Sequence, residues 1–487
     1  MGFELNEPRL IREEALIAGR WVGIGERSPI PVHNPATGEK LGSVPACTVE
    51  DTRHAIAAAA AAQRAWSARP AKERSNILRA WFNLVIHHRE DLARIITLEQ
   101  GKPLAEARGE ITYSGAYIEW FAEEAKRAYG DVIPSNRKET RILVLKEPVG
   151  VVATITPWNF PSAMLARKIA PALAAGCAVV SKPAELTPFS ALALAHLAIE
   201  AGVPADLWSV LNGDPQTLGH ELTTNPTVRK VTFTGSTRTG RLLMEQCAST
   251  IKKVSLELGG NAPFIVFESA DVDAAVKGAM FAKFRNNGQT CICVNRFFVH
   301  TKVYAEFRDK LVKAVGALKI GAGLTEGADV GPLINSAAVE KVQTHVNDAV
   351  RHGAAIICGG KQPAAGGFFY EPTVIDGATP EMLVAREETF GPLASLFRFS
   401  DERDAIVLAN RSEFGLAGYF YSRDLGQIWR VAEALEVGMV GANDVMISAE
   451  NIPFGGIKQS GFGREGSKYG LDDYTHTKYI CLGGLSA

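Results

Sequence analysis

The sequence predicts an α/β protein built on a Rossmann-like parallel sheet, followed by a second α/β domain. The first observation is a continuous apolar run, residues 149–155, which is typical of a strand buried on both faces of a parallel sheet. The second is the alternation of such runs with helical segments up to about residue 397. The third is the length of 487 residues, which exceeds one hydrophobic core, so two or three domains are expected.

The individual elements can be assigned in chain order. Residues 10–50 hold short strands broken by turns, and residues 48–126 are mainly helical. Residues 141–147 alternate like a peripheral strand, which ends at Pro148. Buried strands are then expected at residues 149–155, 178–182, 208–211, 230–234, 263–267, 296–300, 355–358 and 394–397, and helices at residues 161–175, 187–201, 271–284 and 303–318. We place the boundary between the two parallel-sheet domains near Gly259.

Composition excludes several classes of function. The net charge is −1 and no Lys/Arg run occurs, so neither nucleic acid nor a membrane surface is an expected partner. The first residues lack a secretory signal pattern, and no apolar run reaches membrane-spanning length. The seven cysteines include no Cys-x-x-Cys pair, so no disulfide scaffold and no metal site are expected. A reducing cytoplasm fits this composition best.

One thiol stands out as a candidate nucleophile. Cys291 follows Gly288-Gln289-Thr290, and the glycine suits a tight turn that presents the sulfur at a loop tip. The thiol becomes a strong nucleophile only as the thiolate. A thiol hydrolase would pair it with a histidine, but the nearest histidine in sequence, His300, lies on a predicted strand.

Two motifs lie where a parallel sheet binds nucleotides. Gly235 and Ser236 follow a predicted strand and open a helix, whose free N–H groups favour a phosphate. Lys182 and Glu185 follow another strand, and a carboxylate there can accept ribose hydroxyls. Taken alone, the Gly235-Ser236 motif could equally well be an ordinary glycine-rich turn, and Lys182 and Glu185 could be a solvated ion pair.

Two further residues fit catalytic roles. Asn159 lies in a turn stiffened by two prolines, so its amide is a fixed donor that can stabilise an oxyanion. Glu257 lies among apolar and glycine residues, and partial burial would raise its pKa toward that of a useful base. The alternatives are an ordinary turn asparagine and an ion-paired glutamate.

These segments together resemble the aldehyde dehydrogenase superfamily. Glu257-Leu258-Gly259-Gly260 and Gly288-Gln289-Thr290-Cys291 resemble its two signature motifs. The match continues in order along nearly the whole chain, through residues 157–159, 182–185, 233–236, 388–392 and 453–456. It implies an NAD-binding domain (residues 1–128 and 149–258), a catalytic domain (residues 259–461) and a small β oligomerisation domain (residues 129–148 and 470–487).

The resemblance also implies a mechanism. Cys291 would attack the aldehyde carbon, with the Asn159 amide and its own backbone N–H holding the oxyanion. After hydride transfer, Glu257 would activate the water that hydrolyses the thioester. The dinucleotide would be bound by Ile155, Thr156, Pro157, Trp158, Lys182, Glu185, Gly235, Ser236, Leu258, Glu388 and Phe390.

Within the superfamily, the sequence is most similar to the succinate-semialdehyde dehydrogenases, at residues 163–168, 283–286 and 446–450. In that group two arginines and a serine bind the far carboxylate of the substrate, and Arg167, Arg285 and Ser448 stand at the matching positions. Succinate semialdehyde is therefore expected first, with glutarate semialdehyde or a broader range of aldehydes as the alternative. Arg167 has a second interpretation, as a solvated helix residue.

Two finer expectations concern single residues. Glu185 predicts NAD over NADP, because a carboxylate facing the ribose repels a 2′-phosphate. Cys293 is either a packing residue or the partner of Cys291 in a reversible disulfide that switches activity off.

The resemblance leaves two alternative activities and implies an assembly. A CoA-acylating relative typically lacks the base that Glu257 would supply, and a structural protein with this fold would not need Asn159, Glu257 and Cys291 together. The expected assembly is a homo-oligomer, dimer or tetramer, acting on a small ω-carboxy aldehyde.

Overall fold

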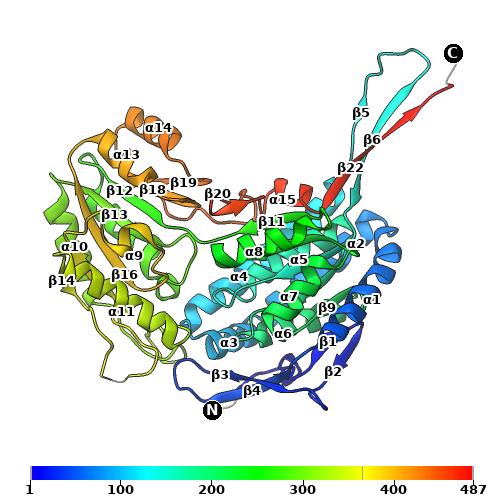
Figure 1. Ribbon diagram of the computed structural model, residues 1–487, viewed down its shortest axis with the longest axis horizontal. Coiled ribbons are helices and arrows are strands. Elements are labelled where there is room, and N and C mark those ends of the chain that lie inside the picture. The colour runs from blue at the N-terminus through cyan, green and yellow to red at the C-terminus, as the bar shows by residue number, and fades with distance from the viewer. Residues whose placement is uncertain (1–2, 365, 485–487) are drawn as a thin grey trace.

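The larger of the two main sheets has eight strands in the order β2-β1-β9-β8-β7-β10-β11-β21 (Figure 1). The computed structural model describes residues 3–364 and 366–484. The five strands from β9 to β11 are parallel, and β2, β1 and β21 add antiparallel edges. Their bounds are β1 Ala15–Ile17, β2 Arg20–Val22, β7 Val151–Ile155, β8 Ala178–Lys182, β9 Trp208–Val210, β10 Val228–Thr234, β11 Lys253–Glu257 and β21 Gly461–Phe462.

The second sheet has seven strands in the order β14-β15-β16-β13-β12-β18-β19, parallel except for the β14 edge. Neighbouring residues of β12 alternate between two hydrophobic clusters, with Phe264 in one and Ile265 in the other, so both faces are buried. The bounds are β12 Ala262–Val266, β13 Val294–His300, β14 Ala355–Cys358, β15 Thr373–Asp376, β16 Leu393–Phe399, β18 Ala417–Tyr421 and β19 Met439–Ala442.

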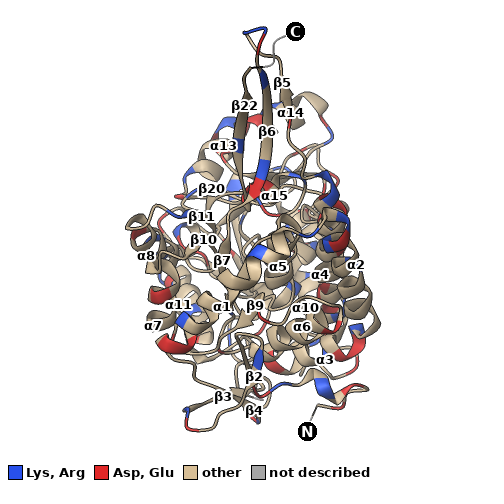
Figure 2. Ribbon diagram, turned by 90° about the vertical axis from the view of Figure 1, so that its right-hand side faces the viewer, with Lys and Arg blue, Asp and Glu red and all other residues tan. Residues whose placement is uncertain are grey.

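A three-stranded antiparallel sheet forms an arm that projects from the body of the molecule (Figures 1 and 2). It consists of β5 Val132–Ile133, β6 Arg141–Pro148 and β22 Thr475–Leu482. Several large apolar side chains on the arm are exposed, among them Tyr129, Val132 and Tyr479. Two small antiparallel pairs complete the strands, β3 Pro29–His33 with β4 Lys40–Pro45, and β17 Phe414–Gly415 with β20 Ile457–Lys458.

Helices cover both main sheets. Among the described residues, four helices precede the first parallel strand, namely α1 Val49–Ser67, α2 Ala71–His87, α3 Arg89–Gln100 and α4 Leu104–Glu124. Four more lie around the first sheet, namely α5 Ala163–Ala175, α6 Pro188–Glu200, α7 Pro215–Thr224 and α8 Thr237–Ala248. Around the second lie α9 Val272–Phe284, α10 Tyr304–Gly316, α11 Ser336–Arg351, α12 Leu383–Arg386, α13 Glu402–Asn410 and α14 Leu425–Ala434, and α15 Tyr469–Asp472 precedes the arm strand β22. Three 3₁₀ segments are η1 Pro8–Leu10, η2 Ala125–Arg127 and η3 Arg285–Gly288.

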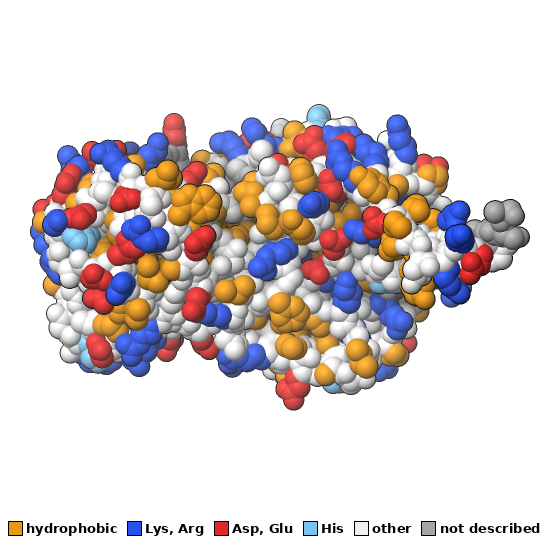
Figure 3. Space-filling view, turned by 90° about the horizontal axis from the view of Figure 1, so that it is seen from above, with side chains coloured by type: hydrophobic (Ala, Val, Ile, Leu, Met, Phe, Trp, Pro, Cys, Tyr) orange, Lys and Arg blue, Asp and Glu red, His pale blue; other side chains and the backbone are white. Residues whose placement is uncertain are grey.

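The surface carries charges of both signs. Lys/Arg and Asp/Glu segments alternate along the outer helices in Figure 2, and they are interspersed with apolar side chains on the face seen in Figure 3. In the described part of the chain, no helix combines the length and apolar character needed to cross a bilayer.

The predicted fold class is confirmed, since two parallel sheets are each covered by helices. The segment after Glu257 leaves the first sheet, and Ala262 begins the second, so the chain crosses between them at residues 258–261. The strands of the main sheets that were not predicted are β11, β15, β18, β19 and β21. All are short, and three of them contain glycine, so their local pattern is weak and burial in the sheet determines them.

Candidate active site

The candidate nucleophile lies in a connection between α9 and β13 that is held in an unusual backbone conformation. Asn286 and Asn287 have φ values of 51° and 55°, in the left-handed region that asparagine tolerates better than most residues. Gly288 follows with φ of 74°, and a Cβ at this position would overlap the carbonyl oxygen of Gly391. The close approach fixes the loop and leaves Cys291 half-buried at its end.

Burial raises the pKa of the Cys291 thiol to about 12, an effect that Arg167 opposes and Glu257 increases. The thiol is therefore protonated at neutral pH in the ligand-free protein. Because the thiolate is the attacking species, the reaction requires a group that takes up the thiol proton.

Asn159 lies beside this loop although it follows β7 of the other sheet. Its side-chain Nδ2 donates to the carbonyl oxygen of Gln289 at 3.0 Å, two residues before the thiol. The Nδ2 of Asn286 donates to the same oxygen at 3.2 Å. The amide of Asn159 is thus brought to the nucleophile loop in a buried position, where an N–H donor is strongest.

Glu257 is the last residue of β11, and its carboxyl group is buried with no hydrogen-bond partner at Oε2 among the described residues. Burial and the nearby carboxylate of Glu465 raise its pKa well above the usual range, while Arg167 opposes the shift. A Cβ at Gly260 would overlap the Cys291 carbonyl oxygen, so the segment after Glu257 packs directly on the nucleophile loop. A carboxyl group with a raised pKa and one free oxygen suits a general base.

A cavity of about 750 Å³ opens at the thiol. The side chains that line it include the candidate nucleophile and all three predicted carboxylate-binding residues, namely Cys291, Arg167, Arg285 and Ser448. Much of the remaining wall is apolar and aromatic, including Phe160, Met164, Met280, Phe281, Phe284, Ile292 and Phe454. The predicted nucleophile and the predicted carboxylate-binding residues therefore line one and the same cavity.

Arg167 lies on α5 with its guanidinium 4.3 Å from the centre of the Phe454 ring. It is buried rather than solvated, and it forms an ion pair with Glu465, which also pairs with Lys168. The second interpretation of Arg167, as a solvated helix residue, is therefore wrong. The Glu465 carboxylate thus has two basic partners, of which Arg167 lines the cavity.

Arg285 is half-buried at the start of η3 and lies between two aromatic rings. Its guanidinium carbon is 5.4 Å from the centre of the Phe160 ring and 5.1 Å from that of Phe281. Ser448 shares a short hydrogen bond with the hydroxyl of Tyr113. Donors from three separate segments thus face the same cavity.

The predicted cofactor residues lie at the carboxyl ends of the parallel strands, where such sheets bind ligands. Lys182 ends β8, and its ammonium group pairs with the Glu185 carboxylate. Gly235 follows β10, and Ser236 caps the N-terminus of α8 by accepting a hydrogen bond from the Thr239 N–H at 3.3 Å. The glycine and the helix start together suit a phosphate group.

Glu388 and Phe390 belong to a segment that packs on the nucleophile loop, because Gly391 lies against Gly288. Glu388 accepts a hydrogen bond from the Gly260 N–H at 3.2 Å, and burial raises its pKa to about 7. The rings of Trp158 and Phe390 meet edge to face with centroids 5.6 Å apart. The cofactor-binding roles of these residues stay predictions.

The other predicted cofactor residues lie on the same connections. Ile155 ends β7, and the Thr156 N–H donates to the Lys182 carbonyl oxygen at 3.3 Å. Pro157 follows directly, and the Leu258 N–H donates to the carbonyl oxygen of Ser460 at 3.0 Å.

Cys293 points away from the substrate cavity. Its Sγ lies 3.3 Å from the buried Nζ of Lys283 and contacts the carbonyl oxygens of Lys283 and Val294 at 3.5 and 3.7 Å. These contacts agree with the packing interpretation. The disulfide with Cys291 stays a prediction.

Sequence reasoning missed three residues that shape the site. Glu465 pairs with both basic residues of α5, Tyr113 bonds to Ser448, and Lys102 bonds to the Asn159 carbonyl. None lies near a motif that carries chemistry. The Gly101-Lys102-Pro103 segment stands out in the sequence only as a helix break.

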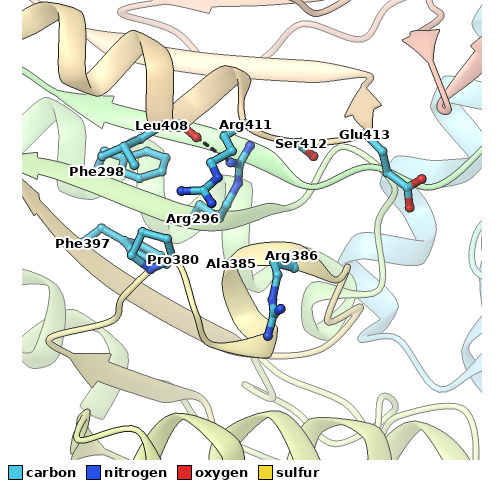
Figure 4. Close-up of a pocket in the computed structure, with 10 residues that line it drawn as sticks. All are labelled: Arg296, Phe298, Pro380, Ala385, Arg386, Phe397, Leu408, Arg411, Ser412 and Glu413. Atoms are coloured by element: carbon cyan, nitrogen blue, oxygen red, sulfur yellow. Dashed lines mark hydrogen bonds between the residues drawn. The ribbon is translucent and has the colours of Figure 1, made fainter.

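A second cavity of about 440 Å³ lies elsewhere in the second domain, beside α12 and the end of α13 (Figure 4). The buried guanidinium of Arg296 lines it and donates to the carbonyl oxygens of Asn261, Leu408 and Ala409 at 2.8 to 3.0 Å. Its hydrogen bonds therefore stabilise the fold, and Cys291 does not line this cavity.

Comparisons with known proteins show the family of the chain. The profile of the aldehyde dehydrogenase family matches residues 21–480. The succinate-semialdehyde dehydrogenase [NADP(+)] of Escherichia coli is 59% identical over 480 residues, 99% of this chain and 100% of that protein. The glutarate-semialdehyde dehydrogenase of Pseudomonas aeruginosa is 58% identical over 482 residues, 99% and 100% of the two chains. The crystal structure of succinate-semialdehyde dehydrogenase from Burkholderia pseudomallei has a TM-score of 0.98 at 59% identity, covering 99% of this chain and 100% of that one.

The predicted preference for NAD over NADP is wrong, because the E. coli relative at 59% identity is named for NADP(+). The structure supplies a physical reason. The Glu185 carboxylate is paired with the Lys182 ammonium group, so its negative charge is compensated and does not by itself exclude a 2′-phosphate.

Proposed function

The chain belongs to the aldehyde dehydrogenase family, and from this premise we propose that it oxidises succinate semialdehyde to succinate while reducing NAD(P). The observation that carries the proposal is the single cavity that Cys291 shares with Arg167, Arg285 and Ser448. An aldehyde at the thiol and a carboxylate at the guanidinium groups would occupy its two ends. Aromatic and apolar walls strengthen the charge interactions by excluding water.

The residues would act in the following order. Cys291 gives its proton to solvent water and attacks the aldehyde carbon, while the Asn159 amide and the Cys291 backbone N–H stabilise the resulting oxyanion. Bound NAD(P) supplies the acceptor for the substrate hydride, which leaves a thioester on Cys291. Glu257 then takes a proton from water, and the water oxygen attacks the thioester carbon. The C–S bond breaks, the acid leaves and the proton held by Glu257 passes to the Cys291 sulfur. Burial raises the pKa of Glu257, which makes its carboxylate a stronger base than an exposed one and supports this role.

Substrate choice would depend on the distance between the thiol and the carboxylate-binding groups. Glutarate semialdehyde is the second candidate, and the naming of the P. aeruginosa relative favours keeping it. It differs by one methylene, which changes specificity by only about 1–3 kcal/mol. A broader range of aldehydes is also open, because the aromatic walls would accept uncharged chains.

Steady-state kinetics test the proposal. We expect kcat/KM to be highest for succinate semialdehyde, lower for glutarate semialdehyde and lowest for an uncharged four-carbon aldehyde, with no requirement for CoA. Both NAD and NADP are compared at saturation. A reaction that depends on CoA, or one that forms no reduced nicotinamide, would contradict the proposal and favour an acyl transferase or a structural protein.

The arm fits self-association. Its short edge strand β5 and the exposed Tyr129, Val132 and Tyr479 would be covered by a second copy of the chain, which removes an exposed edge. Light scattering after size exclusion should give a dimer or tetramer, and a monomer at micromolar concentration would count against this.

The cytoplasmic location also stays a prediction, which cell fractionation tests.

A further inference from the structure

The oxyanion donor proposed above is anchored through its backbone as well as its side chain. The carbonyl oxygen of Asn159 accepts hydrogen bonds from Lys102 Nζ at 2.7 Å and from Asn286 Nδ2 at 2.9 Å. Gln100 in turn donates from Nε2 to Asn286 Oδ1 at 3.1 Å. All three donors are buried, so none of these bonds competes with water.

The strongest of these donors belongs to a fully buried ion pair. Lys102 Nζ lies 2.6 Å from Glu110 Oε2, and both side chains have zero exposure. The ammonium group also lies 3.8 Å from the centre of the Phe160 ring. With one carboxylate, one carbonyl and one ring around it, the ammonium group has a single position available, and the Asn159 carbonyl is fixed relative to it.

Through Glu110, the Lys102–Glu110 ion pair is also connected to α5, the helix that carries Arg167. Its second oxygen, Oε1, accepts hydrogen bonds from the N–H groups of Ser162 at 2.9 Å and Ala163 at 3.2 Å, at the start of α5. The pair therefore joins α4, the Asn159 turn and α5 in one buried network. Lys102 does not line the substrate cavity, whereas Glu110 is one of its lining residues.

We propose that the Lys102–Glu110 ion pair is a positioning element that aims the side-chain amide of Asn159 at the oxyanion formed on Cys291. The inference rests on the proposed function of Asn159 as the oxyanion donor. An N–H group contributes fully only when it is fixed at the place where charge develops, and removal of one such donor typically lowers the rate about 10²- to 10³-fold. Displacement of about 1 Å already costs about 10²-fold.

A double-mutant cycle tests the proposal. Lys102→Met should lower kcat/KM about 10- to 100-fold, and Asn159→Ala should lower it at least as much. In the Asn159→Ala background, Lys102→Met should cause almost no further loss, because the donor that it positions is already absent. If the two losses multiply, Lys102 acts independently of Asn159 and the proposal is overturned.

One measurement and one substitute variant separate positioning from general destabilisation. The inhibition constant of succinate should be nearly unchanged by Lys102→Met, because the carboxylate-binding residues keep their places; a large rise would indicate a collapsed site and refute the specific role. If Lys102→Met does not fold, Lys102→Met/Glu110→Gln removes both charges and takes its place in the cycle.

The chain offers a matched control. Glu99 is a buried carboxyl that accepts hydrogen bonds from Phe189 N and Ser190 N at 2.8 and 2.9 Å at the start of α6, as Glu110 does for α5. Glu99→Gln should lower the melting temperature and leave kcat/KM for succinate semialdehyde unchanged at saturating cofactor, whereas Glu110→Gln should lower the same kcat/KM. Equal kinetic effects would contradict the proposal. A normal rate for Asn159→Ala would instead refute the proposed oxyanion role, so the two failures are distinguishable.

Discussion

Arg285 offers the sharpest test of substrate recognition. Unlike Arg167, whose charge is paired with Glu465, its guanidinium is held between Phe160 and Phe281 and lines the substrate cavity. A hydrogen bond to a charged group contributes about 1.5–3 kcal/mol, and loss of one partner of a buried charge pair costs about 2–5 kcal/mol. Because Arg285 is only half-buried, we take about 2–3 kcal/mol. Arg285→Ala should therefore lower kcat/KM for succinate semialdehyde about 30- to 150-fold.

The assay follows reduced nicotinamide with succinate semialdehyde and with an uncharged aldehyde of equal length. The uncharged substrate should lose less than about 5-fold, the share expected from lost contact with the two rings. Lys277→Ala is the matched control, because this exposed lysine also lines the cavity and its removal changes the charge equally. An equal loss on both substrates, or an equal effect of Lys277→Ala on succinate semialdehyde, would refute the carboxylate role of Arg285.

Two further predictions concern pH. Since burial raises the pKa of Cys291 to about 12, its alkylation by iodoacetamide in the ligand-free enzyme should accelerate with rising pH through the whole neutral range. A rate that reaches a plateau near neutrality, and that is absent in Cys291→Ser, would be inconsistent with a protonated thiol. The pKa of Glu388 is about 7 in the folded protein, against 4.5 for an unperturbed glutamate, so the folded protein holds the proton more tightly than the unfolded chain does. Protonated Glu388 contributes its full stabilisation below about pH 4.5, and this contribution is lost as the pH rises through about 7. Glu388→Gln should therefore flatten the dependence of unfolding free energy on pH in this range for the ligand-free enzyme. An unchanged slope would argue against the raised pKa of Glu388.

The sequence was sufficient where chemistry and local structure coincide. Cys291 follows a glycine turn, Glu257 lies among apolar and glycine residues and Asn159 lies between prolines, so each could be singled out from its neighbours. Strand β8 was predicted with its observed bounds, because all its residues are buried and its alternation with helices is clear. The resemblance then supplied the relation between segments that local patterns do not contain.

What could not be predicted depends on contacts between distant segments. Whether Arg167 was solvated or buried depends on Glu465, which lies near the other end of the chain and has no pattern of its own. The position of Lys102 could not be predicted either. In the sequence it lies in a segment that only breaks a helix, and in the fold its ammonium group donates to the Asn159 carbonyl oxygen. The cofactor prediction failed for a different reason: Lys182 is only three residues from Glu185, and the prediction treated the Glu185 carboxylate as unpaired although the ion pair was among the alternatives.

The central claim, that Cys291 forms a thioester which Glu257 helps to hydrolyse, can be tested in a single turnover. Glu257→Gln enzyme is mixed with succinate semialdehyde and NADP, quenched and analysed by peptide mass spectrometry. We expect about one reduced nicotinamide per subunit to form in a burst, and one succinyl group to remain on Cys291. No burst and no acyl group on Cys291, or an acyl group on Cys293 instead, would contradict the mechanism.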